Sequence, residues 1–207
     1  MLSADAFNRM LGEMSQAAKW RRAYDCPCRD DHSGAARPGC PRCHGKGVVW
    51  ADPVLGWVAI AGQKVQQAWS RMEMYEQGDI VMTLPSDSPL YNLGQNDRIT
   101  MVQSSVPFSR VMTRGDGDRM PFEIDTIDRV YWLVNDVETE GGIPTIATDG
   151  TPSWASGAPD PGVKYSITGR RRPEYFLFNE YPQDRAHYGG QPLPRRVVAR
   201  VIDLLGR

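Results

Sequence analysis

The stretch CPCRDDHSGAARPGCPRCHGKG, residues 26–47, contains every cysteine of the chain. Its pattern is Cys26-x-Cys28, eleven intervening residues, and then Cys40-x-x-Cys43. Zn²⁺ prefers four soft ligands in a tetrahedron, and four thiolates provide them. A Cys-x-x-Cys turn also lets two sulfurs reach one ion. We therefore predict that Cys26, Cys28, Cys40 and Cys43 bind one zinc ion.

The rest of this loop, which we delimit as residues 24–50, fits the same interpretation. Gly45 and Gly47 allow backbone amides to turn back toward a sulfur. The Cys-x-Cys pair is tighter than Cys-x-x-Cys, so His32 and His44 are nearby substitutes if one cysteine does not bind the ion. The alternative is that the four thiols stay reduced without metal, or form a disulfide on oxidation.

The cysteine set favours a structural metal over a catalytic one. A catalytic zinc keeps one coordination position open, usually among histidine or carboxylate ligands, whereas four cysteines fill the shell. The sequence has no His-x-Glu deaminase signature, no Walker-type glycine loop, no Gly-x-Ser-x-Gly elbow and no His-Glu-x-x-His motif. The remaining histidine, His187, is expected in a surface loop. We therefore predict no catalytic residue and no enzymatic activity.

Composition points to a β-rich chain. The 207 residues are 41% hydrophobic and include 20 glycines and 16 prolines, which favours an all-β domain with many turns over a helix bundle. The net charge of -1 gives no overall basic field toward nucleic acid, and the basic runs 170–172 and 195–196 are expected on a solvated surface. No apolar run is long enough to span a bilayer and no signal peptide is visible, so we expect a reducing, cytosolic environment.

An N-terminal helix is predicted over residues 3–20, within an N-terminal segment 1–23. Its apolar residues recur at i, i+3, i+4 and i+7 on one face: Phe7, Met10, Leu11 and Met14. This face packs either on the helix's own domain or on a neighbouring subunit.

A β-rich domain is expected over residues 51–207, interrupted by a long Gly/Pro/Ser/Thr-dense loop at 138–162. The segment 195–205 is either a strand or a short helix. The predicted strands, which include the ambiguous stretch 64–75, are 47–50, 56–62, 64–75, 79–85, 97–103, 106–113, 122–136, 163–170 and 174–181. The predicted fold is mainly β, a β-barrel-like or sandwich domain with an N-terminal helix and an inserted zinc-binding loop. Whether the sheet closes stays open.

Part of the cysteine loop resembles a known zinc-binding repeat. The segment CPRCHGKG, residues 40–47, is similar to the Cys-x-x-Cys-x-Gly-x-Gly repeat in the cysteine-rich domain of DnaJ chaperones. That family carries four such repeats and two zinc ions, whereas this chain has one repeat, one irregular partner pair and no His-Pro-Asp motif. The resemblance implies a zinc knuckle and not a chaperone.

Two longer segments resemble the neck proteins of tailed bacteriophages, a group of head-tail connector, head-closure and collar proteins. They are EQGDIVMTLPSDSPLYNLGQNDRI, residues 76–99, and GRRRPEYFLFNEYPQDRAHYGGQPLPRRVVARVIDL, residues 169–204. The resemblance implies a β-barrel-like virion protein, made in the host cytoplasm, that forms a homo-oligomeric ring on the portal–tail axis. Its partners would be other neck, portal or tail proteins, with no membrane. Double-stranded DNA would pass through the lumen without sequence readout, which a near-neutral chain suits.

If the resemblance holds, the N-terminal helix and loop 138–162 are candidates for contact with neighbouring subunits. Trp154 and Tyr181 either anchor such contacts or pack within their own domain. A second hypothesis is a zinc-ribbon module that binds nucleic acid. Basic residues in and before the cysteine loop favour it, and acidic residues in the same loop oppose it. The basic residues are Arg21, Arg22, Arg42 and Lys46, and the acidic ones are Asp25, Asp30 and Asp31.

Overall fold

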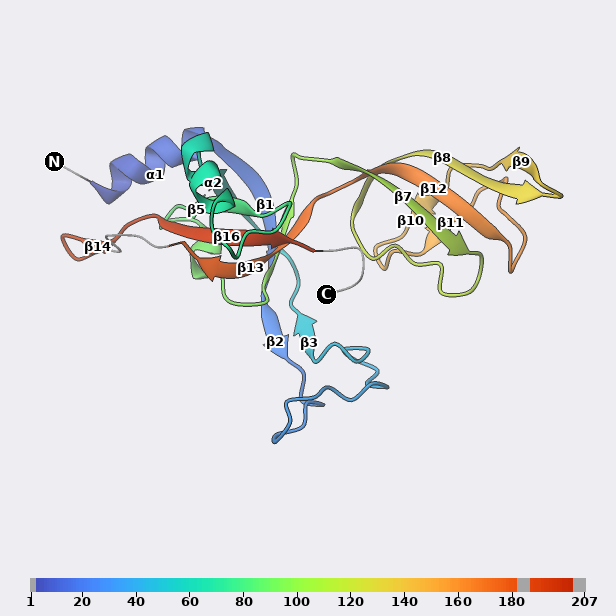
Figure 1. Ribbon diagram of the computed structural model, residues 1–207, viewed down its shortest axis with the longest axis horizontal. Helices are drawn as coiled ribbons and strands as arrows, with labels where there is room; N and C mark the ends of the chain where they lie inside the picture. The colour runs from blue at the N-terminus through green and yellow to red at the C-terminus, as the bar shows by residue number, and fades with distance from the viewer. Residues whose placement is uncertain (1–2, 182–186, 203–207) are drawn as a thin grey trace. The chain divides into compact units, whose positions relative to one another are not determined.

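The computed structural model describes residues 3–181 and 187–202, and the chain is mainly β, as predicted (Figure 1). Its contacts form two compact units. The first contains residues 3–103 together with the described residues from 174 onward, and the second contains residues 104–173. The segment expected as one β-rich domain, 51–207, is therefore divided between two units. The strands of the first unit come from the sequence before residue 104 and after residue 173.

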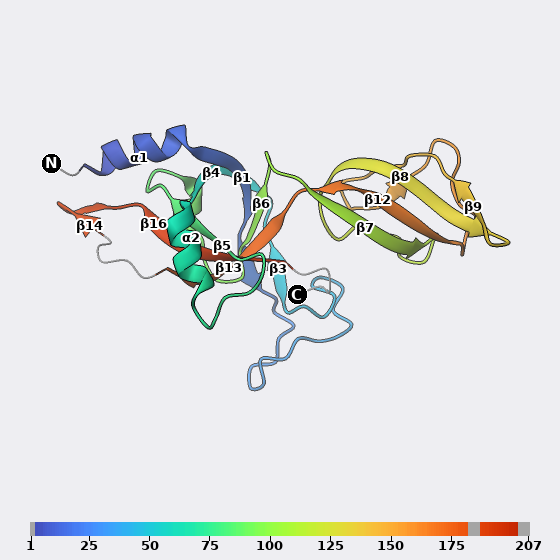
Figure 2. The same cartoon turned by 45° about the horizontal axis from the view of Figure 1, so that its top comes forward.

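Six antiparallel strands of the first unit close into a barrel, in the order β1-β4-β5-β16-β13-β6 (Figures 1 and 2). Strand β1 completes the circle because it pairs with β4 along one edge and with β6 along the other. Closure pairs the edges that an open sheet would leave free. The strands are β1 (Ser15–Arg21), β4 (Val54–Ile60), β5 (Ile80–Leu84), β6 (Arg98–Met101), β13 (Glu174–Glu180) and β16 (Arg195–Val201).

Alternation along the strands fills the barrel with apolar side chains. Val197 and Ala199 of β16 point into this core, and Val198 between them points to the opposite face. The 3-10 helix η1 (Pro89–Asn92) adds Leu90, which is fully buried. A side chain at Gly56 would place its Cβ 2.3 Å from Leu90 Cδ1, so any larger residue there would force Leu90 to shift in the core. The core comprises Ala18, Val58, Met82, Leu84, Leu90, Leu93, Ile99, Met101, Leu177, Val197 and Ala199.

Helix α2 (Gln63–Ser70) covers the outer face of β5 and β16. We predicted strand over 64–75, and that prediction is wrong. Val65 and Trp69 stand four residues apart, which places both on one helical face, and Trp69 is 2% exposed against Val81 and Val198. The imperfect alternation of polar and apolar residues left strand and helix both open, and the tertiary packing of this one face selects the helix.

Helix α1 (Ala4–Glu13) is shorter than the predicted helix 3–20. Gly12, a poor helix former, lies near its end, and the next residues form barrel strand β1, whose Ala18 is fully buried in the core. The predicted apolar face is only partly covered. Leu11 is buried, whereas Met10 and Met14 are 46% and 60% exposed.

The second unit is a four-stranded antiparallel sheet in the order β7-β12-β8-β9, with a short hairpin, β10–β11, as a separate two-stranded sheet. One face of the sheet forms a core of Phe108, Met112, Met120, Phe122, Val130, Tyr165 and Ile167. The strands are β7 (Val106–Thr113), β8 (Ile124–Val134), β9 (Val137–Glu140), β10 (Thr145–Ile146), β11 (Pro152–Ser153) and β12 (Lys164–Arg171).

The predicted long loop 138–162 contains β10, β11 and all but the first residue of β9, and it packs against its own sheet. Trp154 meets Tyr165 edge to face, with ring centroids 5.7 Å apart. In the first unit Tyr181 contacts Trp69 in the same way, at 6.4 Å. Both aromatic residues therefore pack within their own unit, which was one of the two alternatives considered for them.

Arginines of the basic runs 170–172 and 195–196 form ion pairs within their own units. Arg172 forms an ion pair with Asp125 at 2.6 Å, and Arg195 forms one with Glu180 at 2.9 Å. The C-terminal segment 195–205 is strand up to Val201, and its residues 203–205 lie outside the described residues. His187 is exposed, in a small hairpin instead of a loop. That hairpin is formed by β14 (His187–Tyr188) and β15 (Gln191–Pro192).

Candidate metal centre

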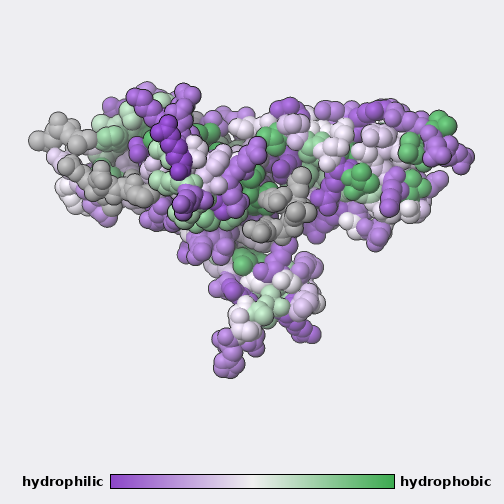
Figure 3. All heavy atoms as spheres, in the orientation of Figure 1, coloured by the Kyte–Doolittle hydropathy of each residue, from purple (hydrophilic) through white to green (hydrophobic). Residues whose placement is uncertain are grey.

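The cysteine loop is held at its base by a short antiparallel hairpin stem, β2 (Ala23–Asp25) and β3 (Val48–Trp50). The N–H of Cys26 donates to the carbonyl of Gly47 at 2.8 Å and closes the loop directly above the stem. We call residues 26–47 the knuckle. Hydrophilic residues line the outer parts of the knuckle in the view of Figure 3, and its buried cluster is formed by cysteines with Val49 beside them.

The first half of the knuckle is ordered by its own polar groups. The N–H of Arg29 donates to the carbonyl of Cys26 at 3.0 Å, which makes a turn around the first cysteine pair. The carboxylate of Asp30 then accepts from the N–H groups of His32 and Ser33, at 3.1 and 2.8 Å. Such local side-chain-to-backbone bonds fix a turn without a hydrophobic core.

The second half wraps around Cys43. The N–H of His44 donates to the carbonyl of Cys40 at 2.9 Å, and the N–H of Gly47 donates to Cys43 Sγ at 3.3 Å. The turn needs left-handed backbone, with φ of 51° at His44, 81° at Gly45 and 72° at Gly47. A side chain at Gly45 would also approach the Pro38 carbonyl oxygen to 3.1 Å. The predicted role of Gly47 in turning an amide toward a sulfur is confirmed.

The four sulfurs meet in the centre of the knuckle, all within 4.8 Å of one another. Cys26 Sγ lies 3.8 Å from Cys40 Sγ, and Cys28 Sγ lies 3.4 Å from Cys43 Sγ. Sulfurs at about 2.3 Å from a tetrahedral zinc are about 3.8 Å from one another. The thiols are free and not bridged as disulfides. The arrangement therefore fits a structural zinc site made by the four predicted cysteines.

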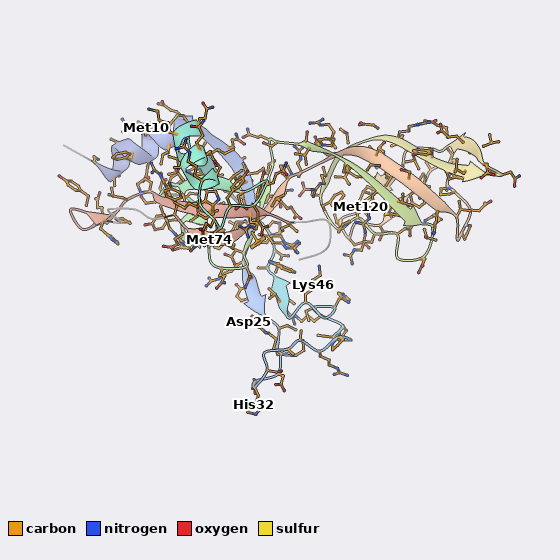
Figure 4. The ribbon with its side chains drawn as sticks, in the orientation of Figure 1. Met10, Asp25, His32, Lys46, Met74 and Met120 are labelled. Carbon is orange, nitrogen blue, oxygen red and sulfur yellow. The ribbon has the colours of Figure 1, made fainter. Side chains whose placement is uncertain are left out.

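Burial separates this cluster from solvent. Cys26, Cys40 and Cys43 are buried, Cys28 is half-buried, and Val49 of the stem packs against the sulfurs. His32 and His44 are both exposed, and His32 lies at the far end of the loop in Figure 4. Within the described residues, the group of side chains placed to hold an ion is the four cysteines, with neither histidine among them.

Backbone amides favour the metal-binding thiolate form of Cys40 and Cys43. Hydrogen bonds from the N–H groups of Cys43 and Arg42 lower the pKa of the Cys40 thiol to about 6. For Cys43, burial raises the pKa, but hydrogen bonds from the N–H of Gly47 and from the thiols of Cys28 and Cys26 outweigh it, and the net pKa is lowered. At Cys28 the N–H of Arg37 lowers the pKa, yet burial and the other sulfurs raise it to about 12. Neighbouring thiolates repel one another, so the four thiols do not all ionise readily without a metal. A bound divalent cation offsets this repulsion.

The stem is tied to the barrel through Asp97, which is 2% exposed. Its carboxylate accepts from the backbone N–H of Ala23 at 2.7 Å, the indole N–H of Trp20 at 2.7 Å and the N–H of Gly94 at 2.8 Å. One buried carboxylate thus joins a barrel strand, a barrel turn and the first stem strand.

The second stem strand is held by Trp50. Its indole N–H donates to the carbonyl of Asn96 at 3.1 Å, and the Arg98 guanidinium lies 3.9 Å from its ring centroid. The amino group of Lys46 lies 6.0 Å from the same ring. A cation over an aromatic ring is favourable, and Arg98 is itself buried enough for burial to lower its pKa. Sequence reasoning missed Asp97, Trp50 and Arg98, because their partners are distant along the chain.

None of the helices in the described part of the chain has the length and apolar character needed to cross a membrane. No protein-family model matches the chain, and no curated protein matches it.

Proposed function

We propose that the chain is a non-enzymatic virion structural protein, a ring-forming component of the head-to-tail connector of a tailed bacteriophage. The observation that carries this proposal is the closed barrel. Segments 76–99 and 169–204, on which the resemblance to phage neck proteins rests, contain three of its six strands, β5, β13 and β16, together with the first two residues of β6. The two resembling segments therefore pair with each other in the barrel, β16 with β5 and β13 with β6.

In this proposal the zinc is structural. Cys26, Cys28, Cys40 and Cys43 would hold it, and four thiolates leave no coordination position for substrate or water. The ion supplies cross-links in a segment that has no apolar core of its own. The knuckle then presents a fixed surface at the end of a stem that Asp97 and Trp50 hold to the barrel.

The proposed setting is the virion, after synthesis in the host cytoplasm. The partners are further copies of the chain in a homo-oligomeric ring and other neck, portal or tail proteins, and no membrane is involved. Double-stranded DNA passes through the lumen without base readout. The net charge of -1 supports this role, because a strongly basic lumen would retain DNA by its phosphates.

Mass spectrometry and electron microscopy of purified virions test the proposal. We expect peptides of this chain in stoichiometric amount, and density for a closed ring between the capsid vertex and the tail. Infected-cell lysate depleted of virions provides the comparison. Finding the protein only in that soluble fraction, with none in purified particles, would end the proposal.

A second candidate function is a nucleic-acid-binding module, favoured by the charges of the knuckle and its stem. Asp25 is paired with Arg29, and Asp30 is used in its own turn. In contrast, within the described residues no acidic side chain pairs with Arg22, Arg37, Arg42 or Lys46, all of which are exposed. This candidate predicts DNA binding whose affinity falls steeply with salt concentration, by about 0.9 in log–log slope for each phosphate contacted. A titration without such dependence would favour the structural role.

A further inference from the structure

Charge is unevenly distributed along the chain. Residues 21–50, which contain the knuckle and its stem, hold six of the 24 lysines and arginines but only three of the 25 aspartates and glutamates. The remainder of the chain therefore has 18 basic and 22 acidic residues. The net charge of -1 conceals a basic segment in an otherwise acidic chain, and a local patch of this kind can attract an anion where the overall charge does not.

The three acidic residues of this segment belong to the stem and to the first half of the knuckle. Asp25 forms an ion pair with Arg29, and Asp30 accepts from the N–H groups of its own turn. Asp31 is the neighbour of His32, which lies at the far end of the loop in Figure 4. Two of the three carboxylates are thus used internally, and the third stands at the far end of the loop.

The rest of the knuckle carries cations alone. We call residues 32–47 the basic half of the knuckle, because they include no aspartate or glutamate. Its basic side chains are Arg37, Arg42 and Lys46, and all three are exposed. No acidic side chain within the described residues pairs with any of them. These charges therefore remain available to an anionic partner.

Two of the three cations come from segments that lie side by side. Gly45, which directly precedes Lys46, is so close to Pro38 that an added Cβ would lie 3.1 Å from the Pro38 carbonyl oxygen. Pro38 in turn directly follows Arg37. Residues distant in sequence thus bring Arg37 and Lys46 to neighbouring positions on the knuckle.

The metal centre holds the backbone at all three cations. Each cation donates its backbone N–H to one of the four cysteines. The pairs are Arg37 to Cys28 Sγ, Arg42 to Cys40 Sγ, and Lys46 to the carbonyl of Cys43 at 3.0 Å. A filled centre therefore fixes the points from which the three side chains project, in a loop that has no apolar core.

The charge of the centre itself acts in the opposite direction. One Zn²⁺ with four thiolates has a net charge of about -2. Three of the four cysteines are buried, whereas the three cationic side chains are exposed. An approaching anion therefore meets the cations first, and the charge behind them keeps the attraction weak.

The surroundings of the cations favour nucleic acid over an acidic protein as the partner. Protein–protein interfaces depend on a few apolar or aromatic anchors in a desolvated centre. Hydrophilic residues line the outer parts of the knuckle in Figure 3, so such anchors are not provided there. Non-specific binding of DNA needs only cations that neutralise phosphates.

We propose that the basic half of the knuckle contacts the phosphate backbone of double-stranded DNA through Arg37, Arg42 and Lys46, and that the metal centre holds this surface in shape. Phosphate contacts carry no sequence information, so binding is independent of base sequence. The inference rests on the second candidate function above and names its contact residues. In a connector the same weak contact would meet the passing DNA.

A salt titration of DNA binding tests the contact. The zinc-loaded full chain is titrated against two fluorescein-labelled duplexes of unrelated sequence at several NaCl concentrations, and anisotropy gives the dissociation constants. Both duplexes should bind equally well. Three phosphate contacts predict a log–log salt slope of about -3, from about -0.9 for each contact. Arg37→Gln combined with Lys46→Gln should reduce the slope to about -1.

A matched double variant controls for the loss of charge. Arg9→Gln combined with Lys64→Gln removes one arginine and one lysine from exposed positions of α1 and α2. This control should bind DNA as the unmodified chain does. An equal loss in the two double variants would show that the charge of the whole chain, and not the knuckle, attracts DNA, and it would overturn the proposal.

Removal of the metal distinguishes a shaped surface from a merely charged one. Cys43→Ser retains all three cations, and we expect it to bind the duplex about tenfold more weakly, because an unordered loop must be ordered on binding. Zinc content and circular dichroism are measured on the same sample. Undiminished binding by zinc-free Cys43→Ser would contradict the role given to the metal centre. If Cys43→Ser does not fold, the double variants, which keep all four cysteines, decide the question.

The outcomes separate this inference from the function on which it rests. If the unmodified chain does not bind DNA at the lowest salt concentration, the second candidate function and this inference fail together. If it binds with a salt slope that Arg37→Gln with Lys46→Gln leaves unchanged, the second candidate function stands and this contact is wrong. Displacement of the duplex by poly-glutamate at equal charge concentration would assign the surface to an acidic protein and would overturn the proposal.

Discussion

The knuckle and the barrel belong to the same unit but are stabilised in different ways. Among the residues that the structure describes, eleven buried apolar side chains form one continuous core in the barrel. The buried cluster of the knuckle consists of cysteines, with Val49 of the stem beside them. Burial of apolar surface stabilises the barrel without any ligand. The knuckle does not bury a comparable apolar core, so a bound ion must provide its stabilisation. We therefore expect the barrel to fold without metal and the knuckle to depend on it, with Asp97 joining the two regions.

Removal of one zinc ligand should have the largest effect, and it should be confined to the knuckle. Zinc binding contributes roughly 10–16 kcal/mol to the folding of isolated zinc-finger peptides. We expect Cys43→Ser to lose the metal and to become sensitive to protease between residues 26 and 47, while the barrel stays folded. Metal content and limited proteolysis measure this, with His44→Ala as the control because His44 is exposed. Global unfolding of Cys43→Ser would show that the two regions are not separable.

The reverse perturbation targets the barrel core. Leu90 is fully buried, and Leu90→Ala should reduce the free energy of unfolding by about 2–5 kcal/mol through the lost burial and the cavity that remains. Zinc content of the folded protein should not change. Chemical denaturation followed by metal analysis tests both statements. Leu55→Ala, at a leucine that is 64% exposed, provides a matched control with little expected loss. Loss of zinc from folded Leu90→Ala would contradict the separation of the two regions.

The junction between the regions should have an intermediate effect. Asp97→Ala leaves the N–H groups of Ala23 and Gly94 and the indole of Trp20 without their acceptor. Unsatisfied buried donors cost about 1–3 kcal/mol. We expect lower thermal stability together with faster amide hydrogen exchange at the stem, and with zinc still bound. Unchanged exchange at Ala23 would show that Asp97 does not hold the stem.

A pH dependence specific to the barrel should be the smallest of these effects. Burial raises the pKa of Asp79, but hydrogen bonds from Arg200, the N–H of Glu76 and the indole of Trp69 outweigh it, so the pKa lies below its ordinary value. A lowered folded-state pKa stabilises the fold above the unfolded-state value of about 3.9, and this contribution is lost as the pH falls through the folded-state pKa.

Substitution isolates that contribution. Asp79→Asn should be less stable than the unmodified protein near neutral pH, and the difference should shrink as the pH is lowered below about 4. Urea denaturation at a series of pH values measures it. A difference that stays constant over the whole series would assign the effect to packing and not to the Asp79–Arg200 ion pair.

The metal centre was predictable because its signal is local in sequence. Cys40, Cys43, Gly45 and Gly47 lie within eight residues, and cysteine spacing itself reports which sulfurs meet. Most strands and the mainly β fold were predictable for a related reason, since alternation and turn residues are local patterns. Barrel closure was not predictable, because it depends on β1 pairing with β6, about 80 residues away.

The errors occurred where tertiary contacts override local preference. Residues 15–20 continue a helical pattern but form β1, because Ala18 fills a position in the barrel core. Residues 63–70 alternate imperfectly but form α2, because Trp69 packs against Val81 and Val198. Both decisions depend on partners that the local sequence does not contain.

Metal analysis of the intact, reduced protein tests the central claim most directly. The protein is purified without chelator and without added metal, and zinc is quantified by inductively coupled plasma mass spectrometry against protein concentration from amino-acid analysis. Four cysteines that saturate one buried ion predict one zinc per chain, retained through dialysis and lost in Cys43→Ser. Folded, fully reduced protein without stoichiometric metal would contradict the account, because the knuckle would then hold its shape with neither an ion nor an apolar core.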